Sequence, residues 1–179
     1  MYDDKKNGDI KQDPVNVFTF KLDDGIYGID ILLVREILDY KKITKVPQSL
    51  DFMLGVINLR GNVVPVIDLK LKLNIGKTDV TIDTCIVIVE VAVKGEPTVI
   101  GALADSVYEV MDIESSNIEE APKIGLNINN KFIRGMAKKG NDFVIILDVE
   151  KVFSDEELKI INDSQNKEIS NPQEDQDNI

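Results

Sequence analysis

The stretch FTFKLDDGIYGIDILLVREILDY, residues 18–40, decides the fold because it recurs later in the chain as VAVKGEPTVIGALADSVYEVMDI, residues 91–113. Gly28 of the first stretch lies opposite Gly101 of the second when the two are aligned. Self-similarity at this spacing indicates two copies of one small structural unit. A unit of this size has too thin a core to be stable alone, so we expect the two copies to bury a common core.

A second pair of stretches repeats in the same order along the chain. Residues 52–73 align with residues 132–153, and with a one-residue slip the triplet RGN at 60–62 lies opposite KGN at 139–141. A basic residue followed by Gly and Asn is typical of a tight hairpin turn. The repeat therefore extends over most of the chain and predicts a hairpin in each copy.

The residues inside both copies favour strands over helices. Val and Ile dominate the apolar positions, and aromatic residues make up only 6% of the chain. In VFTFKL the apolar side chains alternate, so Phe18, Phe20 and Leu22 share one face. The run CIVIVEVAV, residues 85–93, is apolar on both faces and must be buried on both sides. This pattern predicts a mainly β fold in which two small sheets or barrels pack together.

One helix is expected after the second copy. Ser154 is followed three residues later by Glu157, which is the pattern of a capping box at a helix N-terminus. Leu158 and Ile161 then fall on one apolar face of the helix. The sequence therefore predicts a helix over residues 155–163 that packs against the β body.

The two ends of the chain differ in composition from the part between them. Residues 1–14 are polar, and residues 164–179 are acidic and contain few apolar side chains. Such segments bury too little apolar surface to order themselves, so we expect flexible tails around a folded domain at 15–163. Within that domain, the stretch SLDFMLG at 49–55 is interpreted as a second, shorter helix.

The composition excludes several classes of function. The net charge is −11, which opposes binding to phosphate backbones and to anionic membrane surfaces. The chain has no histidine, the commonest general base and metal ligand, so we expect no catalytic residues, no metal site and no cofactor. The single cysteine, Cys85, lies in an apolar run and is interpreted as a small core residue. No signal peptide or transmembrane run is found, so the cytoplasm is the expected compartment.

One corner of the first copy allows two interpretations. The residues NLRG comprise Asn58, Leu59, Arg60 and Gly61, and glycine allows the positive φ that a tight turn requires. The corner can therefore be simple hairpin chemistry. It can also be a surface for a partner protein, because the second copy lacks the Asn-Leu pair and an Arg beside apolar groups is a common interface anchor.

The chain resembles the CheW family, the coupling proteins of bacterial chemotaxis, from about Val15 to Leu158. The resemblance is carried by four stretches, of which NLRG followed by VPVIDL is the most specific: FKLDDGIYGIDILLVREI, GVINLRGNVVPVIDL, GALADSVYEV and ILDVEKVF. It implies two five-stranded SH3-like β-barrels around a shared apolar core, followed by the C-terminal helix. The first barrel would comprise roughly residues 15–70 and the second roughly 80–150, with an exchange of strands between them left open.

The resemblance also implies a function in signal transduction. The expected protein is an adaptor, or scaffold, that couples the cytoplasmic signalling tips of chemoreceptors (methyl-accepting chemotaxis proteins) to the histidine kinase CheA. It would catalyse no reaction, would be a monomer when free, and would be recruited from the cytoplasm to membrane-associated receptor clusters. It would bind the regulatory domain of the kinase barrel against barrel, through residues that the sequence does not assign.

Residues for receptor binding are carried over from the family by position. The NLRG corner falls on residues 58–61, and the family's acidic residue falls on Glu36, with Val34 beside it. The resemblance implies that Glu36 and Arg60 pair and order the receptor-binding face. The predicted receptor-binding residues are Val34, Glu36, Asn58, Leu59, Arg60 and Gly61.

Three alternatives remain for the function. The first is a regulatory CheW-like module of another two-component system, either of the CheV type or outside chemotaxis. A CheV-type protein also needs a receiver domain, and the residues after the predicted helix are too few to form one. The second is an enzyme, which would require a pocket with convergent carboxylates of perturbed pKa. The third is nucleic-acid binding through SH3-like barrels, against which the charge argues.

Overall fold

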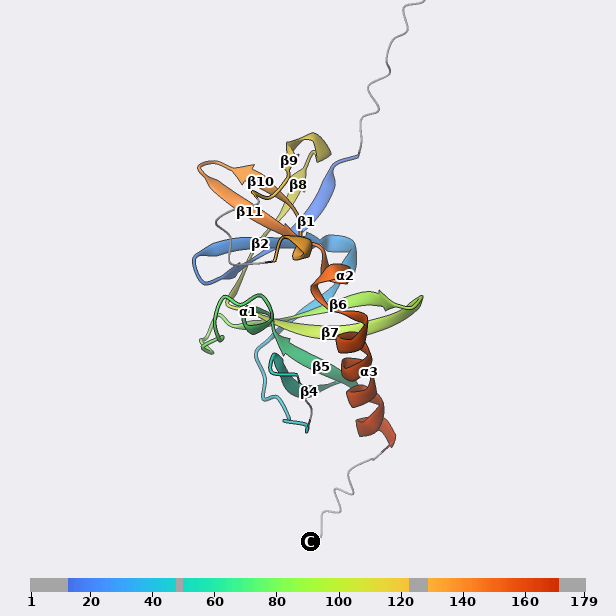
Figure 1. Cartoon of the computed structure of the whole chain (residues 1–179). Coiled ribbons are helices and arrows are strands. Elements are labelled where there is room, and N and C mark those ends of the chain that lie inside the picture. Colours follow the sequence, from blue (N-terminus) through green and yellow to red (C-terminus); the bar gives the residue numbers. More distant parts are fainter. Residues whose placement is uncertain (1–12, 48–49, 123–128, 171–179) are drawn as a thin grey trace, which may run out of the picture.

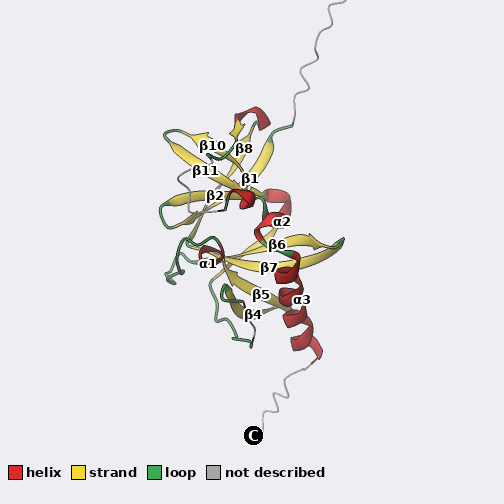
Figure 2. Ribbon diagram, in the orientation of Figure 1, coloured by secondary structure: helices red, strands yellow, loops and turns green. Residues whose placement is uncertain are grey.

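The computed structural model describes residues 13–47, 50–122 and 129–170. Two β-sheets lie one above the other, with two short helices between them and the long C-terminal helix beside the lower sheet (Figures 1 and 2). The prediction of a mainly β fold is confirmed. The predicted N-terminal tail at 1–14 lies almost entirely outside the described residues, as does the part of the predicted acidic tail from residue 171 onward.

The first sheet contains six strands in the order β8-β1-β2-β11-β10-β9. Most neighbours are antiparallel, and the pair β2 and β11 is parallel. The sixth strand is the two-residue β9, which pairs along β10. The strands are β1 (Val15–Leu22), β2 (Gly25–Asp30), β8 (Ser106–Ile113), β9 (Ile118–Glu119), β10 (Ile133–Lys139) and β11 (Asp142–Leu147).

The second sheet contains five strands in the order β3-β6-β7-β5-β4, with β5 and β7 parallel. Its strands are β3 (Val34–Asp39), β4 (Met53–Leu59), β5 (Asn62–Asp68), β6 (Cys85–Val93) and β7 (Glu96–Ala104). The α-helices are α1 (Leu69–Lys72), α2 (Val149–Val152) and α3 (Asp155–Ser170). Short 3₁₀ helices are η1 (Ile31–Leu33), η2 (Ser115–Asn117) and η3 (Asn130–Phe132). Closure of each sheet into a barrel stays a prediction.

The two sequence copies are distributed over both sheets. Each copy forms a hairpin, a single strand and a second hairpin: β1-β2, β3 and β4-β5 in the first copy, and β6-β7, β8 and β10-β11 in the second. The first hairpin of each copy pairs with the single strand and the second hairpin of the other copy. The second sheet is therefore built from consecutive strands between residues 34 and 104, and the first sheet from strands on either side of it. This nested division differs from the two barrels predicted at roughly 15–70 and 80–150, and it corresponds to the exchange of strands that the sequence left open. The exchange arises because parallel pairings of β2 with β11 and of β5 with β7 join the copies.

Apolar side chains form one core between the sheets and a smaller cluster within each sheet. The shared core includes Phe18, Phe20 and Leu22 from β1, as the alternation predicts. It also contains Val87 and Val89 of β6. The opposite face of β6 belongs to the cluster of the second sheet, so this strand is buried on both faces as predicted. The two copies therefore bury a common core that neither forms alone.

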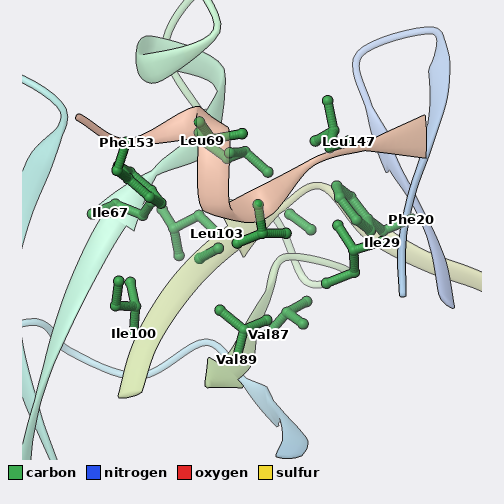
Figure 3. A pocket seen from close by; sticks show the side chains of 14 residues that line it. Phe20, Ile29, Ile67, Leu69, Val87, Val89, Ile100, Leu103, Leu147 and Phe153 are labelled. Atoms are coloured by element: carbon green, nitrogen blue, oxygen red, sulfur yellow. The ribbon is translucent and has the colours of Figure 1, made fainter. Parts of the chain in front are cut away.

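A small cavity of about 30 Å³ lies in the shared core (Figure 3). Phe20 and Ile29 approach it from the first sheet, and Ile67 and Val87 from the second. All its lining side chains are apolar, so a water molecule there would lack the polar side-chain partners that it needs. The cavity lies where the two sheets meet and is part of their packing.

A buried ammonium group also joins the two sheets. Lys70 follows β5 and forms ion pairs with Asp23, in the β1-β2 turn, and with Asp105, between β7 and β8. Its backbone N–H and that of Thr78 both bond to Asp68, a carboxylate that is 1% exposed. Because every buried charge in this group has a partner, the cost of its burial is offset.

Helix α3 begins where the sequence predicts and ends later. Ser154 Oγ accepts the N–H of Glu157 at 3.1 Å, and Glu157 Oε1 accepts the N–H of Ser154 at 2.9 Å, which confirms the capping box. Leu158 and Ile161 are buried in the shared core. The helix continues to Ser170 rather than ending at 163, because once its first turns are docked a helix propagates through polar residues at little cost.

The short helix expected at 49–55 is wrong in the part that the structure describes. Asp51 and Phe52 form a turn, and β4 begins at Met53; residues 48–49 lie outside the described residues. Met53 packs into the shared core, and Val56 pairs with Pro65 of β5. Tertiary pairing thus overrides the local preference of these residues.

Replacing Glu157 by Gln should lower the melting temperature at pH 7. Burial acts to raise the pKa of Glu157, but the hydrogen bond from Ser154 and the ammonium of Lys72, 3.0 Å away, outweigh it and hold the pKa below 4.5. A carboxyl with a lowered pKa stabilises the fold above its unfolded pKa, and this stability is lost as the pH falls through the folded value. The difference in melting temperature between wild type and variant, followed by circular dichroism, should therefore shrink below pH 4.5. A constant difference at all pH values would contradict this.

Candidate functional site

The NLRG corner forms the tight turn of the β4-β5 hairpin. Arg60 and Gly61 are its two central residues, with φ of 52° and 85°. Two successive positive φ values define the turn that matches the twist of a hairpin, and glycine adopts them without strain. Asn58 Oδ1 accepts the N–H of Gly61 at 2.8 Å and closes the turn. The hairpin interpretation of this corner is thus correct, and it fixes the direction in which Arg60 leaves the backbone.

Arg60 forms a two-pronged ion pair with Glu36. Its Nη1 donates to Glu36 Oε1 at 2.8 Å and its Nη2 to Oε2 at 2.7 Å. The hydrogen bonds from Arg60 are the main reason why the pKa of Glu36 lies below its ordinary value, against the effect of burial. Glu36 lies on β3 and Arg60 directly follows β4, and these are the two edge strands of the second sheet. The ion pair therefore bridges strands that do not pair with each other in the sheet.

A groove opens beside this ion pair. It has a volume of about 630 Å³. Its walls carry a second ion pair, between Arg35 on β3 and Glu90 on β6. Apolar side chains of the second sheet form its floor. The lining residues are Arg35, Glu36, Leu59, Arg60, Asn62, Val64, Ile88 and Val99.

The structure brings most of the predicted receptor-binding residues together. Glu36, Leu59 and Arg60 line the groove, whereas Asn58 and Gly61 shape the turn beneath Arg60. Val34 is the exception, because it packs against the shared core. Neither Arg35 nor the groove itself was predicted from the sequence.

The second copy contains an ion pair at the corresponding place. Glu109, which aligns with Glu36, pairs with Lys139, which aligns with Arg60 across the slip. The ammonium of Lys139 also lies 4.4 Å from the ring centroid of Tyr108, and that of Lys21 lies 5.2 Å from it. An aromatic ring thus stands where the first copy has Arg35. The duplication preserves the acid-base bridge and changes its surroundings.

Residues 16–157 match the family model described as CheW-like domain. The chain belongs to the CheW family. It is 32% identical over 142 residues to the chemotaxis protein CheW of Klebsiella aerogenes, and the match covers 79% of this chain and 83% of that protein. It is 31% identical to the chemotaxis protein CheV3 of Helicobacter pylori, over 80% of this chain and 45% of that protein.

A solved structure supports the same assignment. The scaffolding protein TtCheW of Thermoanaerobacter tengcongensis superimposes with a TM-score of 0.71 at 35% sequence identity. The match covers 84% of this chain and 94% of that one. The two-sheet architecture described above is therefore that of the CheW family.

Exposed apolar residues lie on the edge strands of this CheW-family chain. Ile37 on β3 is 42% exposed, and Val110 on β8, its counterpart in the second copy, is 55% exposed. Val107 on β8 aligns with Val34 and is 43% exposed. The alignment of the two copies already shows that these positions are apolar in both. It did not indicate that they are exposed, because apolar residues in strands are more often buried.

Other functional groups are sparse in the described residues. Within residues 13–47, 50–122 and 129–170, no helix is both long and apolar enough to span a bilayer. In the same ranges no three His, Cys, Asp or Glu side chains gather as a metal-binding group would. Cys85 is buried, and desolvation raises the pKa of its thiol to about 11. A thiol that stays protonated at neutral pH is a poor nucleophile and fits the predicted core position.

Proposed function

We propose that this CheW-family chain is an adaptor that couples chemoreceptor tips to a CheA-type histidine kinase. The observation that carries the proposal is the ion pair of Glu36 and Arg60 at the rim of a groove. It fixes an arginine at an exposed corner, and fixed arginines beside apolar surface are typical anchors of protein interfaces. Such a surface binds and orients a partner and needs no catalytic group.

The receptor tip would bind on the face that includes this corner. The proposed receptor-binding residues are Val34, Glu36, Asn58, Leu59, Arg60 and Gly61. Within this set, Glu36 and Arg60 supply polar contacts, and Leu59 supplies apolar surface. Val34 contributes through the packing of β3 on the shared core. Apart from this corner, the edge-strand residues Ile37, Val107 and Val110 expose apolar area of the kind that partners cover.

The kinase would bind elsewhere on the molecule through its own CheW-like regulatory domain. The solved relative is described as a scaffolding protein, and that description supports a role in assembly. The chain would be a cytoplasmic monomer when free and would join receptor clusters at the membrane through the receptor tips. Receptor state would then bias kinase activity through the geometry of the assembly.

A second candidate is a regulatory module of the CheV type or of a two-component system outside chemotaxis. The match to CheV3, in which the chain corresponds to 45% of the longer protein, favours it. Both candidates share the receptor-binding face. They differ in whether the chain also binds a separate kinase.

The two are distinguished by reconstitution from purified parts. The full chain is mixed with the cytoplasmic tip fragment of a chemoreceptor and with the regulatory domain of CheA from the same organism, and the complexes are sized by analytical ultracentrifugation. The proposal predicts both binary complexes and one ternary complex. Binding of the receptor tip without the kinase domain would favour the second candidate, and binding of neither would reject both.

A further inference from the structure

The groove combines an apolar floor with a charged rim. Val64 and Ile88 are at most 2% exposed and form its base, while Leu59 and Val99 are half-buried and remain accessible along its walls. A partner side chain that entered here would meet aliphatic groups. The floor alone would therefore accept any apolar side chain, and the rim must supply the selectivity.

The two ion pairs of the rim are oriented alike. The Arg60 side chain is 73% exposed and that of its partner Glu36 only 25%. The Arg35 side chain is 55% exposed and that of its partner Glu90 only 29%. In both pairs the guanidinium faces the solvent, and the carboxylate lies closer to the sheet. Although each pair is neutral, a molecule approaching the groove meets two arginines first.

Each arginine also has donors left for a partner. A guanidinium carries five N–H groups, and the contacts with Glu36 use two of those on Arg60. Carboxylates are the groups that such planar donors bind best in proteins. The rest of the chain is strongly acidic, with a net charge of −11, so this rim is a local exception to the general repulsion of anionic partners.

We propose that the groove receives an acidic segment of the receptor tip, in which an apolar side chain enters between Leu59 and Val99 and flanking carboxylates bind Arg35 and Arg60. This inference rests on the proposed function and specifies the chemistry of the partner. It adds Arg35 as a binding residue and Glu90 as a positioning residue that partly neutralises it. The charge complementarity of the rim favours an acidic occupant. Residues 79–83 of a second copy, with exposed Val80 and Ile82 between two aspartates, are the competing acidic occupant, and dimerisation of the chain alone in analytical ultracentrifugation would overturn the assignment to the receptor tip.

The test uses two neutral substitutions with opposite expected effects. Arg35→Gln removes one guanidinium, so the affinity for the receptor-tip fragment should fall roughly two- to fivefold, as expected for an exposed ion pair. Glu90→Gln removes the carboxylate beneath Arg35 and leaves its charge uncompensated, so the affinity should rise by a similar factor. Isothermal calorimetry at low salt measures both, with Arg134→Gln on exposed β10 as the matched control that should change nothing.

The sign of the Glu90→Gln effect makes the test specific. A merely structural role of the Arg35–Glu90 pair would weaken binding in both variants, and a cationic partner segment would reverse both signs; either result would overturn the inference. If the wild type binds the receptor tip and neither variant differs from it, the groove is not the contact and only this inference fails. If the wild type binds no receptor tip, the proposed function fails. Methyl shifts of Leu59 and Val99 on addition of the fragment should accompany binding.

Discussion

Arg60→Glu should reduce the affinity for the chemoreceptor tip at least roughly tenfold and leave the melting temperature almost unchanged. The substitution places two carboxylates together where Glu36 and Arg60 now share two hydrogen bonds. It also removes one of the two arginines that face the solvent at the groove. Because the pair is exposed, its loss costs little folding stability, and the effect falls on the surface that a partner meets.

The hairpin turn requires its own controls. Arg60 already has a φ of 52°, a conformation that Ala and Glu tolerate no better than Arg, whereas Arg60→Asn removes the guanidinium with a residue that favours this conformation. Lys94 is the matched control, because it is an exposed basic residue at φ 49° before Gly95 in the β6-β7 turn. Lys94→Glu makes a similar change of charge in the same backbone conformation. Equal losses of receptor binding in Arg60→Glu and Lys94→Glu would reject the assignment of the corner.

Gly55→Ala should destabilise the fold by roughly 3 kcal/mol or more. A Cβ at this position would lie 2.1 Å from the carbonyl oxygen of Thr44 and 2.8 Å from its carbonyl carbon. Both contacts are with backbone that cannot rotate away, because Thr44 exchanges hydrogen bonds with Val56 at 2.8 and 2.9 Å. The substitution must therefore displace β4 from the segment that follows β3. Urea unfolding followed by circular dichroism measures the loss.

The structure offers a control for the backbone conformation itself. Gly76 has a φ of 148°, close to the 149° of Gly55, but a Cβ there would meet nothing within 4 Å. Gly76→Ala should therefore cost only the strain of the conformation, about 1 to 2 kcal/mol. If the two variants lost equal stability, close packing against Thr44 would not be the cause.

Much of the architecture could be predicted because strands and helix starts have recognisable patterns over a few neighbouring residues. The alternation of Phe18, Phe20 and Leu22 identifies a half-buried strand, and Ser154 with Glu157 identifies a helix start. The internal repeat predicts the two equivalent sets of strands. In contrast, the exchange of strands between sheets depends on which hairpins pack together in space, and no local pattern specifies that. The preference of residues 49–55 for a helix was overridden for the same reason.

The candidate site was predictable in part. The resemblance to the CheW family suggested the pair of Glu36 and Arg60, and the structure contains it. The groove could not be predicted, because it depends on the relative placement of β3, β6 and the β4-β5 turn. Arg35 and Glu90 are 55 residues apart and have no motif that links them. Charged residues are common on strands, so neither Arg35 nor Glu90 stands out in the sequence. Only the structure shows that the guanidinium of Arg35, like that of Arg60, faces the solvent beside the groove.

In the sequence, the strands of the second sheet (the inner sheet) all lie between β2 and β8 of the first, and this order constrains how the molecule can assemble during synthesis. All strands of the inner sheet have emerged from the ribosome once Ala104 is free, so this sheet can complete its pairing early. The β1-β2 hairpin is made first but finds its neighbours only when β8 and β11 follow, and contacts between distant segments form slowly. Until then the aromatic face of β1 must be sheltered by the inner sheet or by a chaperone. The corner that holds the Glu36–Arg60 ion pair belongs to the inner sheet and can therefore form before the first sheet is complete.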